Sequence, residues 1–248
     1  MSTTNARALS AAEYDLGWRD WSDFIRYNPG ARHRRRQILA LLRGILFNHL
    51  LDVGCGNGEM LGELRRHFPR ASFTGVDLSP EVVERNRRRL PGIDFGVLDI
   101  AASALDRQFD AILCSEVVEH LEDRPRAFGH LAAMLAPGGH LLVTTPTGRM
   151  YETERRFGHT THPTPAEIRD YAAAHGLRVV LLRNWGWPLY QALKWVTNVN
   201  PEWALRNFAS GSYSPGAKLV SHALYWANFL NLPSAPGGCQ LFALLRKK

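Results

Sequence analysis

Cysteine is scarce in this chain, and no long apolar run occurs in it. Only Cys55, Cys114 and Cys239 are present among the 248 residues, and no two of them show Cys-x-x-Cys spacing. This pattern argues against a disulfide framework and a structural zinc site, and it favours the reducing cytoplasm. No apolar stretch reaches about 18 residues, the length of a membrane-spanning helix. Residues 1–10 lack the apolar centre of a signal peptide, so we expect a soluble, cytoplasmic protein.

Acidic residues are outnumbered by basic ones. The chain has 30 Lys and Arg against 23 Asp and Glu, a formal net charge of +7. Arginines cluster within residues 32–36, 85–89 and 155–156, and such clusters either attract phosphate-bearing partners or form solvated helix faces. For residues 85–89 we favour the solvated end of a helix, where the helix dipole stabilises cations. For residues 32–36 both alternatives stay open.

Apolar runs alternate with helix-forming segments through most of the chain. Strands are expected at residues 50–53, 72–76, 93–97, 109–115, 140–145, 178–182 and 240–245. Helices are expected at residues 31–47, 59–67, 80–89, 124–135 and 165–175. Strands that alternate with helices predict an α/β protein, with a Rossmann-like, mostly parallel sheet that is covered by helices on both faces.

The chain divides into four expected parts. They are an N-terminal helical cover (1–48), a sheet core (49–183), an aromatic-rich insertion (184–238) and the last strand of the core (239–248). The insertion holds five of the seven tryptophans. Its apolar stripe at residues 219–230 has helical spacing, and it suits a cover for the sheet, a ligand pocket, a homodimer face or a peripheral membrane contact.

A glycine-rich turn follows the first core strand and is the most informative segment. It carries Gly54, Gly56 and Gly58, and glycine lets the backbone pass close to a ligand. Asp77 ends the next apolar run, where a carboxylate can accept hydrogen bonds from both ribose hydroxyls. Because Glu59 at the helix start would oppose a pyrophosphate, a nucleoside ligand without phosphate fits best.

These motifs occur in a family-specific order. Asp52-x-Gly-x-Gly-x-Gly, then Gly-Val-Asp-Leu-Ser at residues 75–79 and Val-Leu-Asp-Ile at residues 97–100, resemble the class I S-adenosylmethionine-dependent methyltransferases. The resemblance implies that the glycine loop faces the methionine part of the cofactor, that Asp77 holds the ribose and that Asp99 meets the adenine. The cofactor-binding residues it implies are Asp52, Gly54, Cys55, Gly56, Gly58, Asp77, Leu78, Asp99, Ile100 and Ser115.

Candidate catalytic residues follow the fourth expected strand. Glu116, Glu119 and His120 stand at i, i+3 and i+4, so in a helix they would share one side and could hold a divalent cation. This pattern resembles the ubiquinone-biosynthesis O-methyltransferases and the small-RNA 2'-O-methyltransferases, in which it binds a metal. The same resemblance implies further ligands in a later loop, here His159 and His162. We favour the metal-free alternative, in which His120 or His159 is the base beside Glu116 and Glu119.

The expected activity is O-methylation of a small, hydrophobic or lipid-like acceptor that the aromatic insertion encloses. Tryptophan and tyrosine supply large, rigid contact surfaces for such an acceptor. One alternative is a metal-assisted RNA 2'-O-methyltransferase. A nucleic-acid partner is not expected, however, because the aromatic residues do not interleave with a basic groove. Another alternative is a partner protein that binds the cofactor without catalysis.

Overall fold

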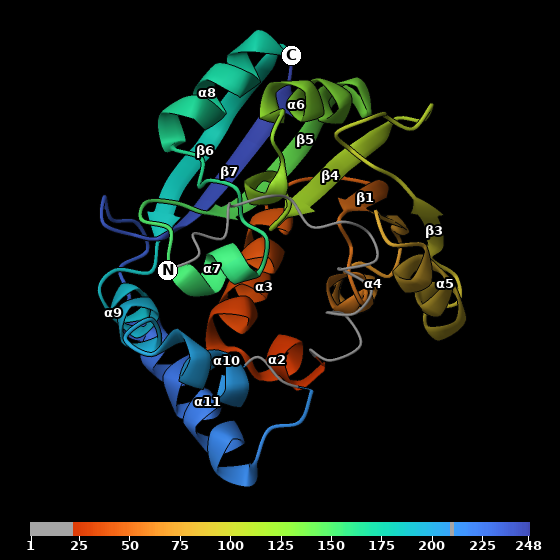
Figure 1. Cartoon of the computed structure of the whole chain (residues 1–248). Helices are drawn as coiled ribbons and strands as arrows, with labels where there is room; N and C mark the ends of the chain where they lie inside the picture. Colours follow the sequence, from red (N-terminus) through yellow and green to blue (C-terminus); the bar gives the residue numbers. More distant parts are fainter. Residues whose placement is uncertain (1–21, 209–210) are drawn as a thin grey trace.

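The computed structural model describes residues 22–208 and 211–248 (Figure 1). Residues 1–21 of the expected helical cover therefore lie outside the described part. Seven strands form one sheet in the order β3-β2-β1-β4-β5-β7-β6. They are β1 (His49–Val53), β2 (Ser72–Asp77), β3 (Asp94–Val97), β4 (Phe109–Ser115), β5 (Leu135–Pro146), β6 (Leu177–Trp185) and β7 (Gln240–Lys247).

The first five strands run parallel, and β7 runs antiparallel to both of its neighbours. The central strand β1 has four buried residues out of five, as expected for a strand that is covered on both faces. The expected α/β class with a Rossmann-like, mostly parallel sheet is confirmed. The Pro-Gly-Gly segment at residues 137–139, which stands between the expected helix 124–135 and the expected strand 140–145, lies within β5, and the register with β4 shifts beside it.

Two apolar clusters lie on opposite faces of the sheet. Side chains of successive strand residues alternate between the faces, so Leu50 joins one cluster and Leu51 the other. Helices α3 (Pro29–Leu42), α4 (Glu59–His67) and α5 (Pro80–Arg89) supply the Leu50 cluster. Helices α6 (Arg124–Ala133) and α8 (Pro165–Ala174) supply the Leu51 cluster. The short helices α2 (Ser22–Tyr27) and α7 (Glu152–Arg156) complete the part before the insertion.

Helix α3 is shorter than the apolar spacing predicts. It begins after Asn28, whose side chain accepts a hydrogen bond from the Ala31 backbone N–H at 2.9 Å, and Pro29 occupies its first turn. It ends at Leu42 rather than at residue 47. Beyond this end Ile45 and Phe47 still pack against the core, whereas Leu46 is 96% exposed.

The residues that we assigned to the insertion are mostly helical. They form α9 (Leu189–Thr197), α10 (Pro201–Phe208), α11 (Pro215–Ala227) and the short 3-10 helix η2 (Asn228–Leu230). In Figure 1 these helices lie apart from the sheet, and α11 contacts α3. His33 of α3 makes a 2.8 Å hydrogen bond to the Tyr225 backbone oxygen and stacks on Trp185. None of the helices in the described ranges is long and apolar enough to span a membrane.

Gly75 in β2 provides a test of packing beside the expected ligand edge. A Cβ atom there would lie 2.6 Å from Leu61 Cδ1 and 2.7 Å from Phe95 Cε1. We expect Gly75→Ala to lower the free energy of unfolding by about 1–3 kcal/mol, because the added methyl overpacks the core. Urea denaturation measures this change. Gly96→Ala in β3 is the matched control, since its nearest contact would be at 3.8 Å. Equal stability of the two variants would contradict the close packing of Gly75.

Candidate active site

The glycine loop turns sharply between β1 and α4 and is held against β2. Gly54, Gly56 and Gly58 have φ angles of 71°, 49° and 73°, which favour glycine. The Gly54 backbone N–H donates to the Val76 carbonyl oxygen at 2.8 Å. A Cβ atom at Gly54 would collide with the Val117 side chain. The loop therefore requires glycine for both conformation and space.

Asp77 lies at the carboxyl end of β2 and faces this loop. Its Oδ2 accepts a hydrogen bond from the Gly56 N–H at 2.9 Å, and its Oδ1 accepts one from the Ser79 N–H at 3.0 Å. Asp52, at the end of β1, is buried nearby. Burial, together with the Asp77 charge, raises the pKa of Asp52 to about 8. Asp52 is therefore a neutral donor at pH 7, whereas Asp77 presents the acceptor oxygens.

Helix α5 also supports the loop, and the sequence reasoning missed its role. The Asn86 side-chain amide donates to the Gly56 carbonyl oxygen at 2.6 Å, and its buried Oδ1 has no hydrogen-bond partner. Arg85 donates to Asn57 Oδ1 at 2.6 Å, and Arg89 donates to the Asn57 carbonyl oxygen at 2.8 Å. Arg85 and Arg89 thus bind the loop, whereas the sequence had led us to expect only a solvated helix end. The available signal in the sequence was the position of Asn86 three residues after Val83, which places this polar residue on the apolar side of the expected helix.

The remaining expected cofactor residues lie along the same sheet edge. Asp99 follows β3, is exposed, and accepts a hydrogen bond from the Ala101 N–H at 2.9 Å. Its neighbour Ile100 is buried. Ser115 at the end of β4 is hydrogen-bonded to Thr144 of β5 at 2.7 Å. Burial raises the pKa of the Cys55 thiol well above its ordinary value, so this residue is inert.

The segment after β4 is not the α-helix on which the shared side of Glu116, Glu119 and His120 depended. Glu116 has a φ angle of 58°, and only a 3-10 turn, η1 (Val118–His120), follows it. Glu116 therefore does not share one helix side with the other two residues, and it has partners of its own. It forms an ion pair with Arg34 of α3 at 3.0 Å and accepts a hydrogen bond from the Gln240 amide at 2.8 Å. Arg34 is a site residue that the sequence reasoning did not single out.

Glu119 is part of this turn, and its side chain is fully buried. Its Oε2 accepts a hydrogen bond from the Thr145 hydroxyl at 2.9 Å, whereas its Oε1 has no hydrogen-bond partner. Burial, and then the charge of Glu116, raise the pKa of Glu119 well above its ordinary value. The surroundings of Glu119 therefore favour its protonated form over a charged carboxylate.

Three histidines meet beside η1. The rings of His120 and His159 are in edge contact with their centroids 4.8 Å apart, and His159 Nδ1 lies 3.1 Å from His162 Nε2. Burial lowers the pKa of His120 to about 4 and that of His159 to about 2. It also lowers the pKa of His162 to about 4, against the effect of the nearby Glu154 carboxylate. All three imidazoles are thus neutral at pH 7, and burial makes each of them a weaker base than an exposed histidine.

The insertion reaches this cluster through one lysine. Lys194 of α9 forms a 2.5 Å ion pair with Glu154 of α7, and Glu154 Oε2 lies 3.7 Å from His162 Nε2. Burial lowers the pKa of Lys194, but the Glu154 charge more than offsets this effect. The pKa of Lys194 is therefore above its ordinary value. The Lys194–Glu154 ion pair therefore connects α9 of the insertion to His162.

Two overlapping groups of described residues could hold a metal ion. Glu119, His120 and His159 form the first, and Glu154, His159 and His162 the second, with ligand atoms within 4.8 Å of one another. The partnerless Oε1 of Glu119 suits the first group. In the second group the Lys194 ammonium already neutralises Glu154 and opposes a cation. Glu116, which the metal alternative includes, belongs to neither group.

The large aromatic residues of the insertion do not gather around this cluster. Trp185 is buried, where it stacks on His33 and Tyr190. In contrast, Trp195, Trp203 and Trp226 are 60%, 51% and 67% exposed. These three side chains thus point outward in the described structure rather than enclosing an acceptor.

The comparisons with known proteins start from a family model. The model described as a methyltransferase domain matches residues 19–191, well over half of the chain. The chain belongs to this methyltransferase family. The resemblance to class I S-adenosylmethionine-dependent methyltransferases is confirmed, and this protein is an enzyme of that class.

Individual relatives align with this methyltransferase over only part of their own length. Trans-aconitate 2-methyltransferase of Methylobacterium radiotolerans is 35% identical over 126 residues, which are 50% of this chain and 48% of the relative. Nodulation protein S of Rhizobium tropici is 35% identical over 142 residues, covering 54% and 57%. The chain thus spans about half the length of these relatives.

Solved structures share the fold of this methyltransferase. The N-methyltransferase NodS from Bradyrhizobium japonicum, in complex with S-adenosyl-L-homocysteine, has a TM-score of 0.56 at 21% identity and covers 89% of this chain and 88% of its own. A TehB-like methyltransferase from Corynebacterium glutamicum has a TM-score of 0.58 at 17% identity, covering 96% and 98%. At these identities the likeness shows the fold alone.

The buried neutral histidines predict a pH-dependent stability. Below pH 6.5 the unfolded chain binds protons that folded His159 excludes, so the free energy of unfolding falls by up to about 1.4 kcal/mol per pH unit for this residue. Asp52 and Glu119 act in the opposite direction, because their pKa values are raised. We therefore expect urea denaturation between pH 6.5 and 5 to weaken the wild type more steeply than His159→Asn. The exposed His67→Asn is the control, and parallel curves for wild type and His159→Asn would contradict the prediction.

Proposed function

We propose that this methyltransferase methylates a hydroxyl oxygen of a small, hydrophobic acceptor, with His120 as the general base. S-adenosylmethionine supplies the methyl group on an electrophilic sulfonium. In-line displacement then requires that the protein positions the acceptor, excludes water and removes the hydroxyl proton. The proposal rests on the neutral imidazole of His120 beside the carboxyl end of β4.

The residues at the glycine loop fit the cofactor. The close backbone turn, the partnerless Asn86 Oδ1 and the two oxygens of Asp77 all face the same edge of the sheet. We assign the ribose hydroxyls to Asp77, because a carboxylate accepts two hydrogen bonds there. Asp99 and Ile100, on the adjacent loop after β3, are assigned to the adenine. We assign the remaining part of the cofactor to Gly54, Gly56 and Gly58, together with Asp52, Cys55, Leu78 and Ser115.

The hydrogen bond of His120 decides which of its nitrogens can act as the base. Its Nδ1 lies 3.1 Å from the Gly158 carbonyl oxygen, which can only accept, so Nδ1 carries the proton. The lone pair of the neutral ring therefore lies on Nε2. His159 packs against this ring and keeps its orientation, with Glu119 beneath it. Nε2 is thus the atom that takes the acceptor proton.

The relatives support a small acceptor. One group is named for trans-aconitate, which is a small molecule, and NodS is named as an N-methyltransferase. We assign the acceptor to the space between η1, the loop with His159 and His162, and α9. Arg34 and Lys194 border this space with positive charge. A carboxylate acceptor like trans-aconitate would need no base, which separates it from a hydroxyl acceptor.

A divalent cation is the second candidate, supported by the partnerless Oε1 of Glu119. Glu119, His120 and His159 would hold it, and it would acidify a hydroxyl acceptor. Binding would require deprotonation of Glu119, which burial disfavours. This cost makes the metal-free route the one that we favour.

Asp77→Ala tests the cofactor site. We expect it to weaken S-adenosylmethionine binding by at least about tenfold, because a charged hydrogen-bond acceptor is lost. Calorimetric titration measures the affinity, and circular dichroism checks that the loop variant is folded. Asp94→Ala is the matched control, since this exposed acid of β3 pairs only weakly with Arg107 at 3.7 Å. Unchanged affinity in the Asp77 variant would refute the ribose assignment.

His120→Asn tests the base against two acceptor chemistries. We expect cofactor affinity to stay within about twofold, while methylation of phenols and alcohols falls by at least about a hundredfold. Methylation of trans-aconitate, if it occurs, should be nearly unchanged, because a carboxylate is already ionised. Release of S-adenosyl-L-homocysteine is measured with chelator and with added magnesium, manganese or zinc.

His175→Asn is the matched control for the loss of an imidazole. Its Nε2 also bonds a backbone carbonyl, that of Pro125 at 2.8 Å, but His175 belongs to neither group that could hold a metal ion. Full activity of His120→Asn on hydroxyl acceptors would remove this residue from the chemistry. Activity that a chelator abolishes would instead select the cation alternative.

A further inference from the structure

An apolar stripe is exposed along α11 and η2. Leu219, Trp226 and Leu230 are 71%, 67% and 74% exposed; the spacing of seven residues places Leu219 and Trp226 on one side of α11, and Leu230 follows in η2. Phe229 is also exposed and stacks on Trp226 with ring centroids 5.4 Å apart. We name Leu219, Trp226, Phe229 and Leu230 the α11 stripe. Patches of this kind on a soluble domain usually mark a contact surface.

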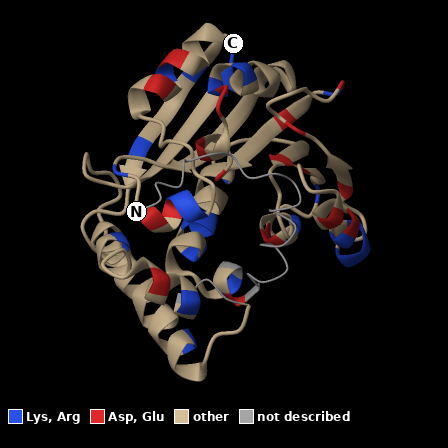
Figure 2. Ribbon diagram, in the orientation of Figure 1, with Lys and Arg blue, Asp and Glu red and all other residues tan. Residues whose placement is uncertain are grey.

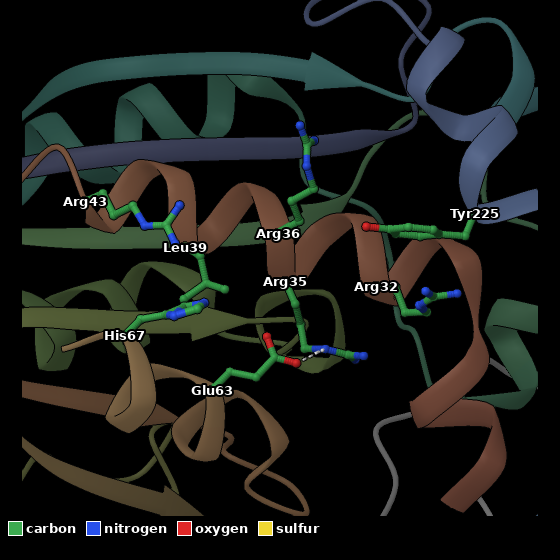
Figure 3. A pocket seen from close by; sticks show the side chains of 8 residues that line it. All are labelled: Arg32, Arg35, Arg36, Leu39, Arg43, Glu63, His67 and Tyr225. Carbon is green, nitrogen blue, oxygen red and sulfur yellow. Dashed lines mark hydrogen bonds and ion pairs between the residues drawn. The ribbon is translucent and has the colours of Figure 1, made fainter. Parts of the chain in front are cut away.

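A basic pocket adjoins the α11 stripe. It encloses about 270 Å³ between α3, α4 and α11, and Figure 3 shows its arginines projecting from α3 around Tyr225 and Glu63. The residues that line it are Arg32, Arg35, Arg36, Leu39, Arg43, Glu63, His67 and Tyr225. The stripe and the pocket are physically joined, because Arg36 lies over the Phe229 ring, 4.5 Å from its centroid.

The charge in this region is almost entirely positive. Glu63 is the acidic residue among those that line the pocket, and it is engaged by Arg35 at 3.3 Å. The pocket therefore retains a surplus of positive charge. Helix α11 itself carries one charged residue, Lys218, and most of the region around α9, α10 and α11 is uncharged in Figure 2. An apolar stripe thus lies directly beside a cationic pocket.

We propose that the α11 stripe and the basic pocket together bind the surface of an anionic lipid bilayer. Tryptophan, phenylalanine and leucine would enter the boundary between headgroups and acyl chains, while the arginines contact lipid phosphates. Arginine suits this role because its guanidinium binds phosphate with two hydrogen bonds.

A second copy of the chain fits this surface less well than anionic lipid does. In a two-fold dimer the same patch meets itself, so the two basic pockets would be brought together. Four arginines on each side would then repel across the interface, with a single glutamate on each side to compensate. Charge complementarity therefore selects an anionic partner. This inference does not depend on the acceptor or on the base proposed above.

Vesicle co-sedimentation of the full chain tests the proposal. We expect the wild type to sediment with phosphatidylcholine vesicles that contain about 30% phosphatidylglycerol, and much less with pure phosphatidylcholine. The triple variant L219S/W226S/L230S should lose at least about tenfold in partitioning, because it removes the apolar contact. The double variant R36Q/R43Q should lose the preference for phosphatidylglycerol. Tryptophan fluorescence of the wild type should shift to the blue on binding.

Matched variants control for apolarity and for charge. Leu46→Ser removes a 96% exposed leucine on the loop between α3 and β1, and R88Q/R107Q removes two positive charges near β3. Both should sediment as the wild type does, and all variants should keep the S-adenosylmethionine affinity of the wild type.

Three outcomes would overturn the proposal. The first is that the triple variant sediments as well as the wild type. The second is that the wild type ignores vesicles but binds inorganic phosphate in a way that R36Q/R43Q abolishes, which would select a soluble phosphate ligand. The third is that the wild type ignores vesicles and forms a dimer that the triple variant cannot form, as measured by analytical ultracentrifugation.

Discussion

The parallel pairing of β1 to β5 is the constraint on which the rest of this molecule depends. Because parallel strands end at the same edge of a sheet, the turns after β1, β2, β3 and β4 converge there. Asp77 is then within 2.9 Å of the Gly56 N–H, although the two residues are 21 positions apart. The η1 turn, which follows β4, lies at the same edge. The proposed cofactor site and the proposed acceptor site thus lie at the same sheet edge because the strands that lead to them are parallel.

Helix α3 joins this edge to the insertion. Its successive residues serve different neighbours: His33 bonds the backbone of α11, Arg34 pairs with Glu116, and Arg36 covers Phe229. A shift of α3 along its axis would therefore disturb the site and the α11 surface together. This arrangement gives a physical route by which a contact at α11 can bias the position of Glu116.

Burial explains much of the chemistry of the site. Three histidines are kept neutral, protonation of Glu119 is favoured, and the Glu154 charge compensates the buried ammonium of Lys194. The site thus has neutral proton acceptors on one side and the ionised Arg34–Glu116 pair on the other.

The sequence by itself determined the α/β class, the parallel core and the positions of the glycine loop and Asp77, because strand alternation and glycine requirements are local properties. Only the tertiary structure decided the geometry after β4. There Glu116 adopts a left-handed φ angle, and its partner Arg34 is 82 residues away in the chain. The tertiary structure also showed that α3 ends at Leu42 and that Trp195, Trp203 and Trp226 are exposed, whereas Trp185 is buried. Apolar spacing indicates that a helix has an apolar side, but what covers that side depends on contacts between distant segments.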